Sequence, residues 1–218
     1  MPTVTYAAVS KAQPDRLEDA IELSRQVAKM TGRHGVEGRL LAADLAGEQT
    51  GTLVFAMEFE SPERYAALID EIDQDTEITE MRVRLTRSNS PVTILSTSLS
   101  SEIPLPTARP RGRGNIVEVH LTKCAPGRLE AAIDEADTAA SLLTKAGAVG
   151  VQAFQMSYAG MQSGSLGIAV EWPSVRAQAQ SVAVWAADPA GVKLATAMLN
   201  GTSASTIVSS ALYRDIPL

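Results

Sequence analysis

The chain contains one segment twice, and this internal repeat limits its possible folds more than any other feature. Residues 11–21, KAQPDRLEDAI, return as residues 123–133, KCAPGRLEAAI, with Lys, Pro, Arg, Leu, Glu, Ala and Ile at the same spacing. The two copies also end alike, because Ile-Pro-Leu stands at 103–105 and again at 216–218. Ordered matches along the whole length predict a tandem duplication of one structural unit.

The two copies align with one inserted residue. Equivalent residues differ in number by 112 up to the glycine pairs Gly35–Gly147 and Gly38–Gly150. Further along, the shift, 162 minus 49, is 113, and residues 49–61 then map onto 162–174. We therefore expect an insertion between these two regions of the second copy.

A segment of different composition separates the copies. Residues 104–114, PLPTARPRGRG, hold three prolines and two glycines, which prevent a regular helix or strand. The three arginines of this segment predict a solvated linker. The expected organisation is therefore a first repeat at 1–103, a linker at 104–114 and a second repeat at 115–218.

Each copy is predicted to follow the order strand, helix, strand, strand, helix, strand. The first strand is clearest at 116–122, where Val117, Val119 and Leu121 alternate with polar residues. Pro14 and Pro126 suit the first turn of the first helix, and the glycine-bearing segments 46–51 and 159–164 suit hairpin loops. Ser61, Asp75 and Asp188 are suited to cap helices. The last strands are expected near 92–99 and 206–212. Asp75 and Asp188 can each cap a further short helix.

This element order predicts an α+β fold with a shared interior. A single unit makes an antiparallel sheet with helices on one face only, which leaves the other face exposed. Two units in one chain can cover these faces by packing the sheets together. We therefore expect two tandem βαββαβ units whose antiparallel sheets pack face to face as an intrachain α/β barrel.

The pattern resembles the dimeric α/β-barrel superfamily of ferredoxin-like proteins, which includes NIPSNAP proteins and antibiotic-biosynthesis-type monooxygenases. Residues 55–65, FAMEFESPERY, and 168–174, IAVEWPS, look like the third strand of that superfamily, where an acid and an aromatic residue lead into the second helix. The resemblance implies two fused ferredoxin-like repeats. It places no catalytic residue on this chain.

Glu118 and His120 are the main candidates for acid–base chemistry. Residues two apart on a strand point to the same side, and a neighbouring carboxylate stabilises a charged imidazolium. If this side lines the space between the sheets, the pair can transfer protons. The alternative is a polar pair with no catalytic role. Tyr6 and Ala8 stand at these positions in the first copy, so such a site is one-sided, and Tyr6 is the third candidate.

Composition excludes several other classes of function. The net charge of −6 argues against nucleic-acid binding, and Cys124, the only cysteine, can form neither an intrachain disulfide nor a thiolate cluster. No glycine-rich phosphate loop and no Gly-x-Ser-x-Gly motif occurs. Neither a secretory signal nor a membrane span is recognisable. We therefore expect no cofactor, no metal, no nucleic-acid or membrane partner, and a cytoplasmic location.

Three functions remain open at this point. The first is binding of a small organic molecule between the two sheets. The second is a cofactor-independent monooxygenase or isomerase that acts on an aromatic or polyketide-like substrate, with His120 and Glu118 or Tyr6 moving protons. The third is a structural or assembly module whose barrel is filled by side chains. Further homo-oligomerisation of this intrachain pseudo-dimer is compatible with each of them.

Overall fold

The computed structural model describes residues 3–218 as two halves with the same order of elements. The first half consists of β1 (Val4–Ala12), α1 (Leu17–Arg33), β2 (Gly38–Leu45), η1 (Gly47–Gln49), β3 (Thr52–Phe59), α2 (Pro62–Gln74), α3 (Thr76–Leu85) and β4 (Val92–Ile103). The second half consists of β5 (Ile116–Cys124), α4 (Leu129–Lys145), β6 (Gly150–Tyr158), η2 (Gly160–Gln162), β7 (Leu166–Trp172), α5 (Val175–Ala187), α6 (Pro189–Leu199) and β8 (Ser205–Ile216). The predicted order is confirmed, and α3 and α6 are the further helices.

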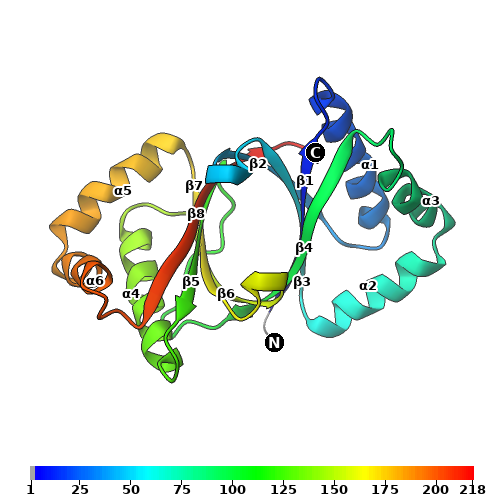
Figure 1. Cartoon of the computed structure of the whole chain (residues 1–218). Helices are drawn as coiled ribbons and strands as arrows, with labels where there is room; N and C mark the ends of the chain where they lie inside the picture. Colours follow the sequence, from blue (N-terminus) through cyan, green and yellow to red (C-terminus); the bar gives the residue numbers. More distant parts are fainter. Residues whose placement is uncertain (1–2) are drawn as a thin grey trace.

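The strands form one closed antiparallel barrel in the order β1-β3-β2-β8-β5-β7-β6-β4. The halves are joined at both edges, because β2 pairs with β8 and β4 pairs with β6. The helices lie outside the ring, α1–α3 against one half and α4–α6 against the other (Figure 1). The predicted α+β barrel is therefore confirmed, with a single continuous sheet where two facing sheets were expected.

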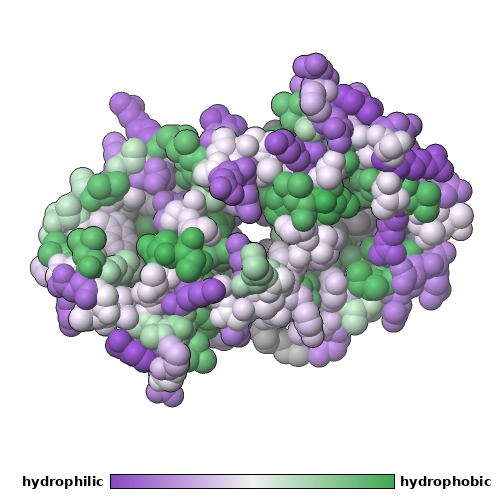
Figure 2. All heavy atoms as spheres, in the orientation of Figure 1, coloured by the Kyte–Doolittle hydropathy of each residue, from purple (hydrophilic) through white to green (hydrophobic). Residues whose placement is uncertain are grey.

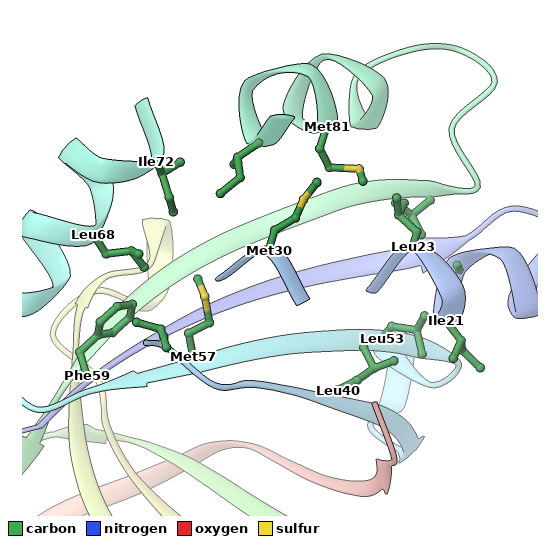
Figure 3. Packing of buried hydrophobic residues seen from close by; sticks show 14 of the residues in the cluster. Ile21, Leu23, Met30, Leu40, Leu53, Met57, Phe59, Leu68, Ile72 and Met81 are labelled. Carbon is green, nitrogen blue, oxygen red and sulfur yellow. The ribbon is translucent and has the colours of Figure 1, made fainter. Parts of the chain in front are cut away.

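Each half has its own hydrophobic core between its strands and its helices. In the first half, Phe59 and Met57 of β3 meet Leu68 of α2 and Met30 of α1, as Figure 3 shows. In the second half, Trp172 is 0% exposed and packs with residues of α4. The helix-facing side chains of the strands therefore pack mainly in these two cores.

The inner side of the barrel holds a separate cluster with members from both halves. Leu41, Val54 and Val117 are buried there, and Val119 and Tyr213 pack against them. These residues alternate along their strands with residues of the outer cores. The side-chain period of two therefore sorts each strand into an inner face and a helix face.

Local signals place the second helix of each half where the sequence predicts it. The Ser61 hydroxyl accepts a hydrogen bond from the Arg64 N–H at 3.3 Å, and Ser174 does the same for Ala177 at 3.2 Å. Asp75 accepts from the Glu77 N–H at 2.9 Å and so begins α3. These contacts satisfy backbone donors that have no partner within the helix.

Three local predictions are wrong in detail. Gly38 pairs with Met57, and Val151 pairs with Val170, the residue equivalent to Met57. Gly38 therefore corresponds to Val151 rather than to Gly150, and the inserted residue lies before β6. Pro14 lies in a turn ahead of α1, not in its first turn, because Arg16 is the N-cap residue. The left-handed conformation of Asp15, the residue after Pro14, delays the start of α1.

The third correction concerns the linker, which is not simply solvated. No helix or strand occurs between β4 and β5, apart from a single bridge between Arg111 and Gly150. The Arg109 side chain is 6% exposed and donates to the Asp137 carboxylate at 2.7 Å and to the Ser141 hydroxyl at 2.8 Å. The linker is therefore anchored to α4.

The outer surfaces of the two halves differ in character. Figure 2 shows hydrophobic residues gathered over the half that carries α5 and α6, where Val182 is 66% and Leu199 is 88% exposed. Within residues 3–218 no single helix has the length and apolar character to cross a membrane, although α5 and α6 together, bent by 90°, satisfy those two criteria.

Candidate functional site

The three candidate residues all lie on the helix face of the barrel. Glu118 contacts Gln178 of α5, and Tyr6 packs against the first core beside Tyr65 of α2. The sequence left open which strand face lines the interior, and the structure places Val117 and Val119 of β5 there instead of Glu118 and His120. The one-residue alternation of a strand gives two possible faces, and the sequence alone did not distinguish them.

The structure brings Glu118 and His120 together but leaves Tyr6 apart from them. His120 Nε2 lies 3.1 Å from Glu118 Oε1. Tyr6 is on β1, which stands opposite β5 in the ring of eight strands. The predicted grouping of Tyr6 with the histidine is therefore not observed, and two separate sites have to be considered.

The first site is a network around His120. On one side the imidazole faces Glu118, and on the other its Nδ1 lies 2.8 Å from the hydroxyl of Ser210 on β8. The second oxygen of Glu118 accepts a hydrogen bond from the indole N–H of Trp172 at 2.9 Å, and Gln178 donates to the first at 3.2 Å. Each side chain of this network is held by at least one other.

The electrostatic environment keeps Glu118 ionised. Burial raises the pKa of this carboxyl, but hydrogen bonds from His120, Trp172 and Gln178, with the attraction of the imidazolium, outweigh it and leave the pKa below its ordinary value. A carboxylate in this state can only accept hydrogen bonds. Glu118 therefore orients the imidazole of His120.

The second site is a cleft of about 380 Å³ on the opposite half, here called the tyrosine cleft. It lies between α2 and β4 of the first half and the β6–β7 hairpin of the second half. Its lining residues are Tyr6, Tyr65, Thr97, Ser98, Leu99, Tyr158, Ala159, Gly160 and Ser163. Three of the four tyrosines of the chain therefore line one cleft.

Burial strengthens the preference of Tyr6 for its protonated form in this cleft. Desolvation raises the pKa of the Tyr6 phenol, the neighbouring Tyr65 raises it further, and Arg82 lowers it by a smaller amount. The phenol consequently remains protonated at neutral pH and can donate a hydrogen bond to a ligand. It is a poor base for the same reason.

The two sites occupy equivalent places in the two halves. Tyr6 pairs with Met57, two residues before the end of β3, and Glu118 pairs with Val170, two residues before the end of β7. Strand pairing therefore makes Tyr6 and Glu118 equivalent. Thr97 of the cleft is equivalent to Ser210 of the network, because the numbering shift between the two halves is 113 in this region, one more than at Tyr6 and Glu118. One position in the fold therefore carries aromatic residues in one half and an acid–base network in the other.

Four residues of the two sites were not predicted from the sequence as functional, namely Tyr65, Tyr158, Gln178 and Ser210. The predicted repeat carried a usable signal for Gln178 and Ser210, because they align with Tyr65 and Thr97 of the first half. Tyr158 gave no such signal, since it reaches the cleft only through the pairing of β6 with β4.

The other histidine, His34, belongs to neither site. It ends α1, and its ring nitrogens lie 3.1 Å from Glu71 and 3.2 Å from Asp75, on α2 and at the start of α3. This agrees with a capping residue that also joins three helices. Over residues 3–218 no group of three or more His, Cys, Asp or Glu side chains is placed to hold a metal ion.

Comparison with known proteins identifies the fold. No family model matches the chain, and no curated protein is significantly similar to it in sequence. An anthrone oxidase-like protein of known crystal structure superimposes with a TM-score of 0.61 at 11% identity, over 99% of this chain and 92% of its own. A monooxygenase candidate from Fusobacterium nucleatum gives 0.61 at 8% identity, over 99% and 93%.

A third solved structure is similar to this chain in the same way. A mutant chlorite dismutase from Candidatus Nitrospira defluvii gives a TM-score of 0.58 at 9% identity, over 99% of this chain and 92% of that chain. Identities this low show a shared fold alone. The chain therefore has the dimeric α+β-barrel fold of these proteins.

Proposed function

We propose that the protein binds a small planar aromatic molecule in the tyrosine cleft. The observation that carries this proposal is the convergence of Tyr6, Tyr65 and Tyr158 from three elements that are far apart in the sequence. Aromatic rings favour stacked or edge-to-face contact with another aromatic ring, and each phenol adds a hydroxyl for hydrogen bonding. The cleft thus matches a hydroxylated ring system.

Size and charge support the same ligand class. A volume of about 380 Å³ falls in the range of about 300–1,000 Å³ that is usual for small-molecule sites. The lining residues that the structure describes are all uncharged, and Thr97 and Ser163 contribute further hydroxyls. A neutral ligand with hydroxyl or carbonyl groups at its edge therefore fits better than an ion.

The test is a calorimetric titration with 1,8-dihydroxyanthraquinone as the probe. We expect Tyr65→Ala to weaken binding about tenfold, which corresponds to ~1.4 kcal/mol, because a ring contact is lost. Tyr213→Phe is the matched control, since Tyr213 packs on the inner side of the barrel and its change should leave binding intact. Equal affinity of Tyr65→Ala and the unchanged protein would remove the proposal.

A second candidate function is a monooxygenase or isomerase reaction that begins with proton abstraction. It is supported by two of the similar structures, an anthrone oxidase-like protein and a monooxygenase candidate, and by the position of His120 between Glu118 and Ser210. In such a reaction the imidazole takes a proton from an acidic methylene carbon. Dioxygen then adds to the carbanion, the imidazolium returns its proton to the peroxide, and loss of water leaves a ketone.

This second candidate requires the substrate to reach the His120 network instead of the tyrosine cleft. We expect the protein to consume dioxygen in the presence of anthrone, and His120→Ala to abolish the consumption. Tandem duplication, which we infer from the repeat, would explain why one half kept aromatic residues while the other acquired an acid–base pair. Oxygen uptake that persists in His120→Ala would exclude this role for the histidine.

A further inference from the structure

The His120 network contains a serine hydroxyl that neither proposed function uses. Ser210 Oγ lies 2.8 Å from His120 Nδ1, and His120 Nε2 lies 3.1 Å from Glu118 Oε1. We propose that Ser210, His120 and Glu118 form a nucleophilic relay that accepts the acyl group of small uncharged esters. The proposal is independent of ligand binding in the tyrosine cleft.

The order of the three groups is what an activated serine requires. A serine hydroxyl becomes a nucleophile when a base within about 2.6–3.2 Å can take its proton and a third group orients that base. With its proton on Nε2, the imidazole donates to Glu118 and presents Nδ1 as an acceptor to the Ser210 hydroxyl. The carboxylate then stabilises the imidazolium that forms when the proton moves.

The third member of the relay is itself fixed. Trp172 is fully buried, and its indole N–H donates to Glu118 Oε2 at 2.9 Å. Gln178 of α5 donates to Oε1 at 3.2 Å. Because both donors come from packed elements, the carboxylate holds one rotamer. A fixed carboxylate fixes the plane of the imidazole in turn.

The surroundings of Ser210 define the class of acyl donor. Ser210 itself is exposed, so an ester can approach it from solvent. Leu45, 68% exposed at the end of the neighbouring strand β2, pairs with Leu212, two residues beyond Ser210 on β8. This apolar edge favours a hydrophobic or aryl group, while the negative charge of Glu118 disfavours an anionic donor.

The reaction balances with these groups and water alone. Ser210 Oγ forms a bond to the ester carbonyl carbon, its proton passes to His120 Nδ1, and the bond to the alcohol oxygen breaks as the alcohol leaves with that proton. A water molecule, deprotonated by His120, then attacks the acyl-serine. The products are a carboxylic acid and free Ser210.

The experiment uses the full chain with p-nitrophenyl acetate. Release of nitrophenolate is followed by absorbance, and the acetylated residue is located by mass spectrometry of the proteolysed protein. We expect acetyl on Ser210 and a loss of at least about 100-fold in rate in both Ser210→Ala and His120→Ala. Ser210 is exposed, so its replacement should leave the fold intact.

The matched control is Ser209→Ala. Ser209 pairs with Leu121, so its side chain points to the opposite face of β8 from Ser210, and its removal should leave the rate unchanged. Acetyl found only on lysines or on the chain terminus would overturn the proposal, as would equal rates for Ser210→Ala and the unchanged protein. Ser210→Ala also separates this activity from the oxygenation candidate, which needs the imidazole but not the serine.

Discussion

Tyr6 and Glu118 show how one position in the fold can carry opposite chemistry. Burial raises the pKa of both side chains, but only Glu118 has hydrogen-bond donors that outweigh it. Tyr6 therefore stays a protonated donor and Glu118 stays an ionised acceptor. At the scale of a residue, the side-chain type sets the protonation state at neutral pH, and the neighbours raise the pKa of one residue and lower that of the other at the same backbone position.

This difference gives a prediction for alkaline pH. The folded-state pKa of Tyr6 lies above its ordinary value of 10.0, so the stability that the protonated phenol contributes is complete below that pH and is lost as pH rises through the folded value. We expect the ultraviolet titration of tyrosinate in the native protein to contain a late phase, and Tyr6→Phe to reduce its amplitude. A late phase of unchanged amplitude in this variant would contradict the environment described for Tyr6.

Residue-scale prediction from sequence succeeded for contacts within one strand. Glu118 and His120 stand two apart, and the period of two alone brings their side chains together, as the 3.1 Å separation confirms. Ser210, Trp172 and Gln178 come from other elements, so their contacts depend on strand register and helix packing. No local pattern encodes these.

The linker shows how an element without regular structure can still be closely packed. A side chain at Gly114 would overlap the backbone of Trp172, which cannot move without disturbing β7. The Gly114 N–H also donates to Glu171 at 2.9 Å, and its carbonyl accepts from Arg39 at 2.9 Å. Glycine is therefore required here by close approach of two chain segments.

We expect Gly114→Ala to lower the free energy of unfolding by about 2–3 kcal/mol, because the added methyl group meets backbone atoms. The control is Gly32→Ala in α1, where an added Cβ has no neighbour within 4 Å and should stabilise the helix by about 0.5–1 kcal/mol. Urea denaturation measures both. Equal effects of the two substitutions would refute the close packing of the linker.

Element ends were the least predictable feature of the sequence. The last strands were expected near 92–99 and 206–212, whereas β4 ends at Ile103 and β8 ends at Ile216. The residues missed in β4, from Ser100 to Ile103, all pair with β6 of the other half. A serine-rich segment has little strand preference of its own, and its conformation comes from a partner far away in the sequence.

Across the whole molecule, Arg39 joins the two halves at one end of the barrel. Its guanidinium donates to Glu171 at 2.5 and 3.0 Å and to Asp215 at 3.3 Å, and its side chain is only 13% exposed. The equivalent residue of the other half is Gln152, which reaches Glu58 at 3.5 Å. One end of the barrel therefore carries a much stronger polar connection than the other.

We expect Arg39→Gln, which copies the other half, to destabilise the protein by ~3 kcal/mol, because two partly buried carboxylates lose their cation. Gln152→Ala, at the equivalent position, should cost less than about 1 kcal/mol. Adding Glu171→Gln to Arg39→Gln should recover part of the loss. Chemical denaturation distinguishes these outcomes, and equal losses for Arg39→Gln and Gln152→Ala would contradict the asymmetry.

The overall architecture followed from the repeat and from the need to cover one face of each unit. The location of the sites did not follow, because the interior was taken as the ligand space while the candidate side chains point toward the helices. Closing the barrel fills its inner face with residues such as Val54 and Val117 from both halves. Only the register of the complete sheet shows this.

A crystal structure of the protein soaked with 1,8-dihydroxyanthraquinone tests the central claim most directly, since that claim places ligand binding on the helix face of the sheet. We predict density for the probe between Tyr6, Tyr65 and Tyr158, with none inside the ring of strands. Density enclosed by Leu41, Val54 and Val117, with the tyrosine cleft empty, would contradict it.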